Sequence, residues 1–255
     1  MVDYWLKNKL IALLPQPCLL CGDIGYTGRD LALCKACLGD LPILGETCLR
    51  CANPMEGGFE RLEGFLNTTA LLQTRLCGQC IQKPPYFDHS LAFFPYIAPF
   101  DYLIHAMKFR GKLTVTKLLG QLMADQIHHT LAAFEDLPDG LLPVPLHASR
   151  QQERGYNQSL ELARHISKQL QIPLLNDLAQ RVKAAPPQSS LSVRRRTKNL
   201  HNAYITHYSI KDRHIAIIDD VMTTGTTVNI LAKELKQAGA RRVSVWCFCR
   251  AEPPS

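Results

Sequence analysis

Short apolar runs alternate with segments of helical periodicity from Ser90 to the end of the chain. The runs have the length of strands, and the segments between them repeat their apolar residues with the period of an amphipathic helix. Strands that alternate with helices are typical of βαβ units, in which the strands lie parallel. We therefore predict an α/β domain with strands over 91–97, 141–144, 178–184, 214–218 and 242–248 and helices over 102–109, 117–134, 157–170 and 228–238.

Two residues mark the ends of predicted helices. Asn157 stands where a side-chain oxygen caps the first turn of the helix over 157–170. Gly239 follows the helix over 228–238, and glycine adopts the left-handed conformation that closes many helices. The polar segment 186–199 is too long and too charged for a tight connection, so we predict a functional loop there.

The composition of the chain changes at Lys83–Tyr86, whose sequence Lys-Pro-Pro-Tyr is typical of a linker. The preceding part is rich in cysteine, glycine and proline. It begins with a short amphipathic stretch over 5–14, which we expect to be a helix packed on this part, with a membrane-surface helix as the alternative. We therefore predict an N-terminal helix and cysteine-rich module over 1–87 and the α/β domain over 88–255.

Eight of the ten cysteines lie in four C-x-x-C pairs within the N-terminal part. Two thiolates spaced in this way bind one Zn²⁺ from a tight turn, and two such turns complete a closed tetrahedral site. The four pairs therefore predict two structural zinc ions. The simplest assignment forms one site from Cys18, Cys21, Cys34 and Cys37 and the other from Cys48, Cys51, Cys77 and Cys80, while crossed pairings stay open.

The other two cysteines, Cys247 and Cys249, share a face of the strand over 242–248 with two valines, so we expect them in the core. Reduced thiols in paired knuckles favour a cytoplasmic protein over a secreted disulfide scaffold. The residues before Cys18 agree with this expectation, because charged residues interrupt their apolar run and no small-residue cleavage site follows. No apolar stretch approaches the length that crosses a bilayer.

The net charge of +7 and the pI near 8.9 suit a partner rich in phosphate but exclude little. The placement of the basic residues says more than their number. They cluster at a few places, notably Lys108 with Arg110 and the run Arg194, Arg195 and Arg196. A solvated surface is the ordinary explanation for any one of these clusters.

The segment 215–227, IAIIDDVMTTGTT, joins a buried strand to a turn suited to phosphate. Its first residues are apolar throughout, as expected of a central parallel strand covered on both faces. Glycine then allows a tight turn, threonine hydroxyls add donors, and the start of the next helix adds a favourable dipole. The residues that we expect to hold one phosphate are Thr223, Thr224, Gly225, Thr226 and Thr227.

Asp219 and Asp220 fall at the carboxyl end of the same strand, where open α/β sheets place their ligands. They are poor neighbours for a phosphate, but they accept hydrogen bonds from ribose hydroxyls or hold the water shell of Mg²⁺. A capped strand-to-helix turn without a ligand is the competing explanation. The sequence has neither a G-x-x-x-x-G-K-[ST] nor a G-x-G-x-x-G motif, which argues against an ATPase or a dinucleotide-binding domain.

A second strand end, over 143–147, is followed by cations and by the predicted helix. This arrangement suits a pyrophosphate group, for which the candidate residues are Val144, Pro145, Leu146, Arg150 and Arg154. Lys108 and Arg110 belong to the segment that we expect to form a hood over the pocket of a second ligand, the acceptor of a transferred group. His147 is more simply explained as a turn residue than as a catalytic base.

The buried strand, two acids and T-G-x-T turn resemble the motif with which type I phosphoribosyltransferases bind phosphoribosyl pyrophosphate (PRPP). The resemblance implies that Thr223–Thr227 hold the ribose 5′-phosphate, that Asp219 and Asp220 face the ribose hydroxyls, and that Mg²⁺ accompanies the pyrophosphate. The segment 189–199 resembles the mobile loop that closes over PRPP in amidophosphoribosyltransferases. Arg194–Arg196 are therefore candidates for neutralising departing pyrophosphate, with an exposed nucleic-acid-binding stripe as an equal alternative.

Together these segments match a more particular pattern. Paired zinc knuckles are followed by LIHAMKFRG at 103–111, PVPLH at 143–147, RGYNQ at 154–158 and the PRPP motif. This order resembles the ComF family, which includes ComFC and GntX proteins, over nearly the whole chain. The resemblance implies a type I phosphoribosyltransferase fold behind a small zinc-ribbon module, and an association with DNA uptake during natural transformation.

Three functions stay open. As an enzyme, the chain would transfer the ribosyl group of PRPP to an acceptor that the motifs do not name, and pyrophosphate would leave. As a binding module, it would keep the phosphate-binding fold and grip single-stranded DNA or a protein of the DNA-uptake machinery, with a strong dependence on salt for DNA. As a regulator, it would sense PRPP or a related phosphoribosyl ligand without turnover.

Overall fold

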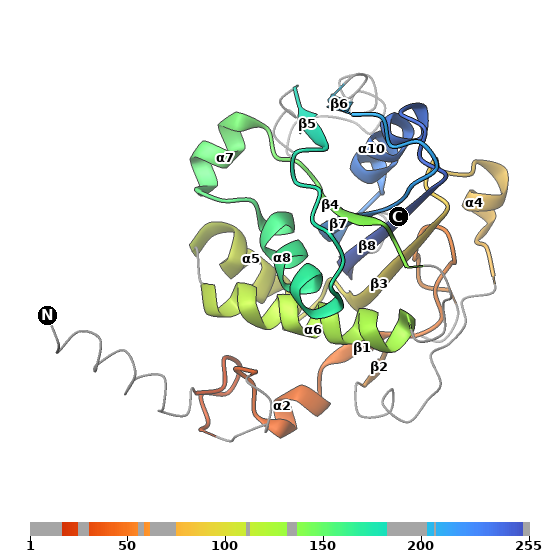
Figure 1. Cartoon of the computed structure of the whole chain (residues 1–255). Helices are drawn as coiled ribbons and strands as arrows, with labels where there is room; N and C mark the ends of the chain where they lie inside the picture. Colours follow the sequence, from red (N-terminus) through yellow and green to blue (C-terminus); the bar gives the residue numbers. More distant parts are fainter. Residues whose placement is uncertain are drawn as a thin grey trace, which may run out of the picture.

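The computed structural model describes residues 17–24, 31–55, 59–61, 75–110, 113–131, 137–182, 203–206 and 208–251. Within them a parallel sheet flanked by helices forms the larger unit, and a cysteine-rich module lies against it (Figure 1). The helix predicted over 5–14 and the loop predicted over 186–199 lie outside these residues. None of the helices in the described ranges combines the length and the apolar character that a membrane span needs.

Four parallel strands form the main sheet in the order β3-β8-β7-β4. Their bounds are His89–Pro95 for β3, Arg242–Arg250 for β8, His214–Met222 for β7 and Gly140–Pro143 for β4. β7 pairs with β8 along its whole length, but with β4 only as far as Ile218. β7 is therefore longer than the predicted strand, and its residues 219–222 continue past the end of β4.

Helices cover both faces of this sheet (Figure 1). They are α5 Phe100–Arg110, α6 Leu113–Leu131 and α8 Gln158–Leu170 on one face and α10 Thr226–Gln237 on the other. The side chains of β7 point alternately to the two faces. Ala216 and Ile218 pack in the core with α6 and α8, whereas Ile215 and Ile217 pack with α10. This division explains why the run over 215–218 is apolar throughout.

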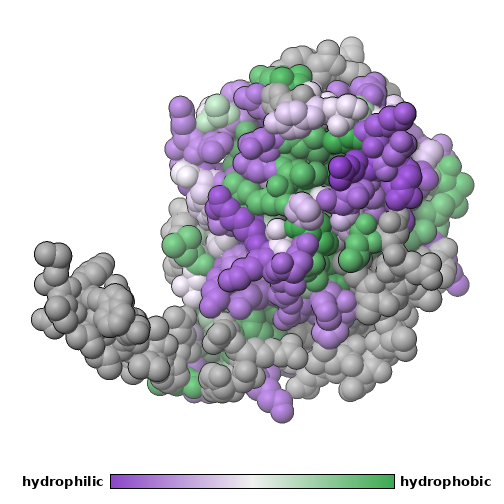
Figure 2. Space-filling model, in the orientation of Figure 1, coloured by the Kyte–Doolittle hydropathy of each residue, from purple (hydrophilic) through white to green (hydrophobic). Residues whose placement is uncertain are grey.

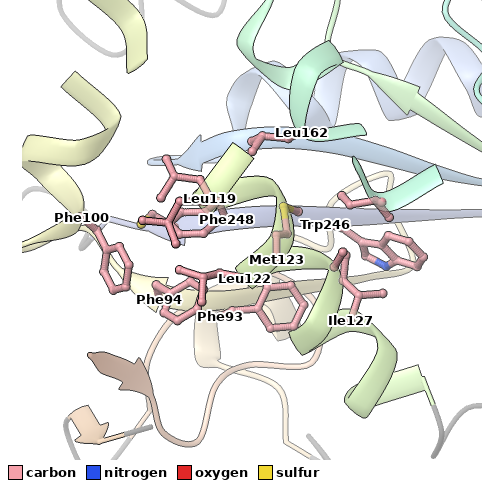
Figure 3. Packing of buried hydrophobic residues seen from close by; sticks show 14 of the residues in the cluster. Phe93, Phe94, Phe100, Leu119, Leu122, Met123, Ile127, Leu162, Trp246 and Phe248 are labelled. Carbon is pink, nitrogen blue, oxygen red and sulfur yellow. The ribbon is translucent and has the colours of Figure 1, made fainter. Parts of the chain in front are cut away.

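Aromatic residues fill the core beneath α5 and α6 (Figure 3). The ring of Phe94 lies with its centroid 4.5 Å from that of Phe100 and 4.7 Å from that of Phe248. These contacts join β3, β8 and the start of α5, and Leu119 and Leu122 of α6 point into the same cluster (Figure 3). The core thereby fixes the position of α5, which carries Lys108, relative to the strand ends.

One predicted strand at the edge of the sheet needs correction, and one helix was not predicted. The segment predicted as a strand over 178–184 contains β5 Ala179–Arg181, which pairs antiparallel with β6 Tyr204–Thr206 and does not join the parallel sheet. Just before β5, the chain touches the edge of the parallel sheet through an isolated bridge between Leu174 and Leu141. A short helix that was not predicted, α7 Ala148–Arg154, lies between β4 and α8.

The cysteine-rich module is built from short elements: α2 Lys35–Gly39, β1 Pro42–Leu44, β2 Phe59–Arg61 and α4 Gly78–Gln82. β1 and β2 pair antiparallel. Leu41 and Ile43 belong to the same apolar core as Leu91 of β3, so the module is packed on the α/β domain. The domain boundary near residue 87 stays a prediction.

The expectation for the two C-terminal cysteines is confirmed in part. Cys247 and Cys249 are both fully buried. Cys247 packs with Val243 and Val245 on the side of α10, but Cys249 belongs to the core on the opposite face. The alternation of side chains along the strand had predicted that both thiols lie in one core. They lie in two different ones.

Candidate phosphate and metal sites

Two groups of four cysteines bring their sulfur atoms together in the described part of the chain, within 4.8 Å of one another in each group. Cys21 Sγ lies 3.7 Å from Cys34 Sγ in the first group, and Cys51 Sγ lies 3.7 Å from Cys77 Sγ in the second. Two thiolates bound about 2.3 Å from one tetrahedral zinc are separated by about 3.8 Å, so both groups fit Zn²⁺. The groups are Cys18, Cys21, Cys34 and Cys37, and Cys48, Cys51, Cys77 and Cys80, which confirms the simplest predicted pairing.

Backbone N–H groups favour the thiolate form of the first cysteine in each site. The N–H of Cys77 donates to Cys48 Sγ at 3.3 Å. Burial alone would raise the pKa of Cys48, but N–H donors, led by that of Cys51, lower it to about 7. The pKa of Cys18 is lowered to about 6 in the same way, against the effect of burial. Zinc binds the thiolate, so these N–H groups favour the metal-binding form of one cysteine in each site.

β7 passes into α10 through a turn that carries hydroxyl groups. Gly225 stands at the N-cap of α10 with φ of 71°, a left-handed conformation that glycine adopts without strain. Thr224 Oγ1 lies 2.8 Å from Thr226 Oγ1. The turn surrounds a small polar cavity of about 40 Å³, which is lined by all the predicted phosphate residues from Thr223 to Thr227 and by Asp219. The cavity lies at the positive end of a 12-residue helix, a position that suits an anion.

The two acids before the turn have different partners. Asp220 is 8% exposed, and its Oδ2 lies 2.8 Å from the Nζ atom of Lys108 on α5. Asp219 lines the cavity, and its Oδ1 accepts a hydrogen bond from the hydroxyl of Ser159 at 3.1 Å. Lys108, predicted as a residue of the pocket cover, is therefore bound to an acid of the motif, and Ser159 joins the site without having been predicted.

Burial and the neighbouring charges shift the pKa of Asp219 towards neutral pH. Burial raises the pKa of Asp219 to about 7, and the charge of Asp220 adds to the rise, while Lys108 opposes it. Burial alone would lower the pKa of Lys108, but attraction to Asp220 raises it, so the ammonium group stays charged. A ligand that brings ribose hydroxyls or a divalent cation to Asp219 would favour its carboxylate form.

The loop after β4 is predicted to contact pyrophosphate. Its backbone groups form hydrogen bonds with β7 and with the residue that caps α8. Val144 is buried; its N–H donates to the carbonyl of Ile218 at 2.9 Å, and its carbonyl accepts from the Asn157 side chain at 3.0 Å. Both backbone groups of Val144 are thus bonded within the chain, which fixes the shape of the loop. Pro145 and Leu146 are half-buried after it.

The segment that follows connects this loop to α5. Arg150 and Arg154 are half-buried on α7, and Arg154 donates from Nη1 to the Gln158 side chain at 3.1 Å. The hydroxyl of Tyr156 donates to the carbonyl of Met107, next to Lys108 along α5. Asn157 caps α8, as predicted, by accepting from the N–H of residue 160.

Some candidates stay predictions. Arg194, Arg195 and Arg196 lie outside the described residues, as does the side chain of Arg110. His147 caps α7 by accepting the N–H of Ser149 at 3.3 Å, which agrees with its interpretation as a turn residue.

One buried arginine beside the turn was not predicted. Arg250 at the end of β8 is 6% exposed and donates from Nη1 to the carbonyl of Met222 at 2.9 Å. It also donates to the carbonyl of Thr223, where the turn begins. Burial lowers the pKa of Arg250 from its ordinary value. The one signal in the sequence is a basic residue that directly follows the apolar run over 245–249.

A second, larger cavity of about 370 Å³ lies at the other end of the strands. Asp139 and Ile215, at the starts of β4 and β7, line it together with Leu174 and Leu175. Figure 2 shows that hydrophobic surface on the viewed face gathers in its upper middle, among hydrophilic residues. Ligands of open parallel sheets bind at the carboxyl ends of the strands, so the cavity beside Asp219 has the expected placement.

Comparison with known proteins defines the class. A family model described as a double zinc ribbon domain matches residues 10–81, and one described as a phosphoribosyl transferase domain matches residues 157–253. With the two four-cysteine sites and the parallel sheet, these matches identify a double zinc ribbon joined to a domain of type I phosphoribosyltransferase fold.

The relatives define the family. The chain is 37% identical over 175 residues to "DNA utilization protein YhgH" of Escherichia coli O157:H7, which covers 68% of this chain and 77% of that protein. It is 35% identical over 179 residues to "Competence protein F" of Haemophilus influenzae, covering 69% and 78%. It is 24% identical over 229 residues to "Competence protein ComFC" of Bacillus subtilis, covering 87% and 85%. The chain belongs to the ComF family.

Proposed function

We propose that the chain binds PRPP, accompanied by Mg²⁺, at the turn between β7 and α10 and that it serves in DNA uptake or utilisation. The observation that carries the ligand is the polar cavity lined by Thr223–Thr227 at the start of α10, with Asp219 beside it. A phosphate there would meet backbone N–H groups, hydroxyls and the positive end of a helix. The names of the relatives support the role in DNA handling.

The residues have separate parts in this proposal. Asp219 and Asp220 are the residues that would face the ribose hydroxyls or hold hydrated Mg²⁺, the ion that would neutralise the pyrophosphate. Lys108 forms an ion pair with Asp220, and burial raises the pKa of Asp219, so a cation or ribose hydroxyls beside Asp219 would favour its carboxylate form. Arg194–Arg196 and the loop after β4 are the proposed neighbours of the pyrophosphate.

Calorimetric titration with PRPP in excess Mg²⁺ tests the site. We expect saturable binding to the wild type and its loss when Asp219 and Asp220 are both replaced by alanine. Asp139→Ala is the matched control, because Asp139 is exposed and lies at the amino end of the strands. Circular dichroism and zinc content establish that each variant is folded. Undiminished affinity in the double variant would contradict the site assignment.

Turnover is tested separately. Zinc-loaded protein is incubated with PRPP, Mg²⁺ and candidate acceptors, and released pyrophosphate is measured. Release that depends on an acceptor and is lost in the Asp219→Ala/Asp220→Ala protein makes the chain a phosphoribosyltransferase. Binding without release favours a sensor or a binding module that keeps the phosphate-binding fold.

Binding of single-stranded DNA is the second candidate function, favoured by the DNA-related name of relatives that are 37% identical. Arg194, Arg195 and Arg196 are the residues proposed to bind the phosphates. Replacing all three by glutamine is expected to reduce the slope of log affinity against log salt by roughly 0.7 for each phosphate that the variant no longer neutralises. Identical slopes would remove this run from DNA binding. A cytoplasmic location and partners in the uptake machinery belong to the same proposal.

A further inference from the structure

The side chain of Arg250 lies between the second cysteine site and the phosphate turn. On one side its Nη1 donates to the carbonyl of Met222 at 2.9 Å and to that of Thr223. On the other side its Nε donates to the carbonyl of Cys51 at 3.1 Å. Cys51 is one of the four cysteines of the second site. One guanidinium group therefore joins the start of the turn to a zinc ligand.

The two carbonyl contacts at the turn also orient N–H groups. In a trans peptide the carbonyl of one residue and the N–H of the next point in opposite directions. When Arg250 holds the carbonyls of Met222 and Thr223, the N–H groups of Thr223 and Thr224 are directed away from it. These two residues line the cavity of the turn. The Met222 carbonyl also accepts the N–H of Ala251 at 3.0 Å, whereas Arg250 adds the contact to the Thr223 carbonyl. Arg250 therefore helps to set the direction of the donors that a phosphate would meet.

Arg250 also needs a counter-charge, because its side chain is buried. The carbonyl and amide oxygens to which the guanidinium group donates carry no net charge. Four thiolates around one Zn²⁺ leave a net negative charge, and Cys51 belongs to such a group. A zinc-loaded second site is therefore a nearby counter-charge for Arg250.

The knuckle that carries Cys51 is anchored to the main sheet. Ser90 on β3 donates from its hydroxyl to the carbonyl of Arg50 at 2.6 Å and from its N–H to the carbonyl of Leu49 at 3.1 Å. Three successive carbonyls of the knuckle thus face donors on β3 and β8. Zinc bound to Cys48 and Cys51 would close the knuckle and hold these carbonyls in place.

We propose that Arg250 is a positioning residue that ties the second zinc site to the phosphate turn, so that zinc in this site strengthens the binding of a phosphorylated ribose. The inference rests on the proposed function, because it names what sets the affinity of the same turn. The first zinc site provides a contrast within the chain. Its Cys18 and Cys34 are packed in the core with α6, and no described hydrogen bond of its four cysteines reaches the turn.

The wild-type protein allows a direct test, because coupling between two binding sites is reciprocal. The zinc affinity of each site is measured by competition with a chelator, with and without saturating PRPP, while free Mg²⁺ is kept in excess. The variant Cys48→Ser/Cys51→Ser keeps only the first site. Its zinc affinity therefore shows which of the two wild-type affinities belongs to the first site. We expect PRPP to tighten the second site about tenfold, within the usual range of such coupling, and to leave the first site within twofold. Equal zinc affinities with and without PRPP would overturn the proposal.

A substitution tests the residue itself. Arg250→Lys keeps the charge but loses the planar fork that reaches several carbonyls at once. We expect it to retain two zinc ions per chain and to bind PRPP at least about tenfold more weakly, the loss that corresponds to the coupling above. Arg242→Lys, at the opposite end of β8, is the matched control and is expected to bind as the wild type does. Wild-type affinity in Arg250→Lys overturns the proposal.

The two proposals fail in different ways. If the wild type does not bind PRPP, the proposed function is wrong and this inference falls with it. If the wild type binds PRPP but the zinc affinity of the second site does not respond, only the inference is wrong. Should Arg250→Lys fail to fold, the zinc competition on the wild type decides.

Discussion

Replacing Asp219 by asparagine is expected to stabilise the free protein while it weakens ligand binding. Asparagine keeps the shape of the side chain and an oxygen that can accept the Ser159 hydroxyl, which lies 3.1 Å from the present carboxylate. It cannot ionise. Burial, reinforced by the charge of Asp220, raises the pKa of Asp219 from 3.8 to about 7, so the folded protein loses free energy when this acid ionises.

The sign and size of the effect follow from that pKa. Below about pH 4 the acid is protonated in the folded and the unfolded chain, and its contribution to stability is fully present. Between about pH 4 and 7 only the unfolded chain ionises, so the folded protein loses about 1.36 kcal/mol for each pH unit, and above pH 7 the loss is complete. The interval from 3.8 to about 7 therefore corresponds to an upper limit of about 4 kcal/mol at pH 8.

Urea unfolding of the wild type and Asp219→Asn at pH 8 and pH 6, without added Mg²⁺, measures this difference. The variant is expected to be more stable at pH 8, and its advantage is expected to shrink by about 1.4 kcal/mol at pH 6. Both proteins carry the same zinc sites, so titration of the cysteines cancels in the difference between their free energies of unfolding. Asp139→Asn, an exposed acid at the amino end of the strands, is expected to gain no such stability. A variant no more stable than the wild type at pH 8, or an equal gap at both pH values, would refute the reasoning.

Further outcomes can be checked on the same protein. Lys108→Met leaves a buried aspartate without its cation and is expected to cost about 3 kcal/mol in urea unfolding, and a loss below about 1 kcal/mol would contradict the buried ion pair. Gly225→Ala places a side chain at φ of 71° without a steric clash, so a cost of about 1 to 2 kcal/mol and weaker PRPP binding are expected, and an unchanged unfolding curve would argue against this turn. Metal analysis is expected to find two zinc ions per chain and one in Cys48→Ser/Cys51→Ser, and two ions in that variant would contradict the assignment of Cys48 and Cys51 as zinc ligands.

The parts of the site that were predictable are local in the sequence. The apolar run over 215–218, the acids after it and Gly225 follow one another along the chain, and each residue type has its own conformational or chemical requirement. The cysteine pairs were predictable from the sequence for the same reason, because both members of a pair lie in one tight turn. The pairing of knuckles followed the simplest order along the chain.

The parts that escaped prediction depend on contacts between distant segments. Ser159 and Asp219 are 60 residues apart, and Arg250 and Cys51 are 199 apart. Periodicity indicates which face of an element is buried, but not which element ends meet at the edge of a sheet. Helix α7 was missed because its sequence, ASRQQER, has no apolar stripe and none of its residues is buried.

The most direct test of the central claim is a crystal structure of the protein with PRPP and Mg²⁺. We predict the 5′-phosphate in the cavity of the β7–α10 turn, with N–H groups of residues 223–227 about 2.7 to 3.2 Å from its oxygens and with Asp219 beside the ribose. A phosphate bound elsewhere, with the N–H groups of the turn bonded within the chain, would contradict it.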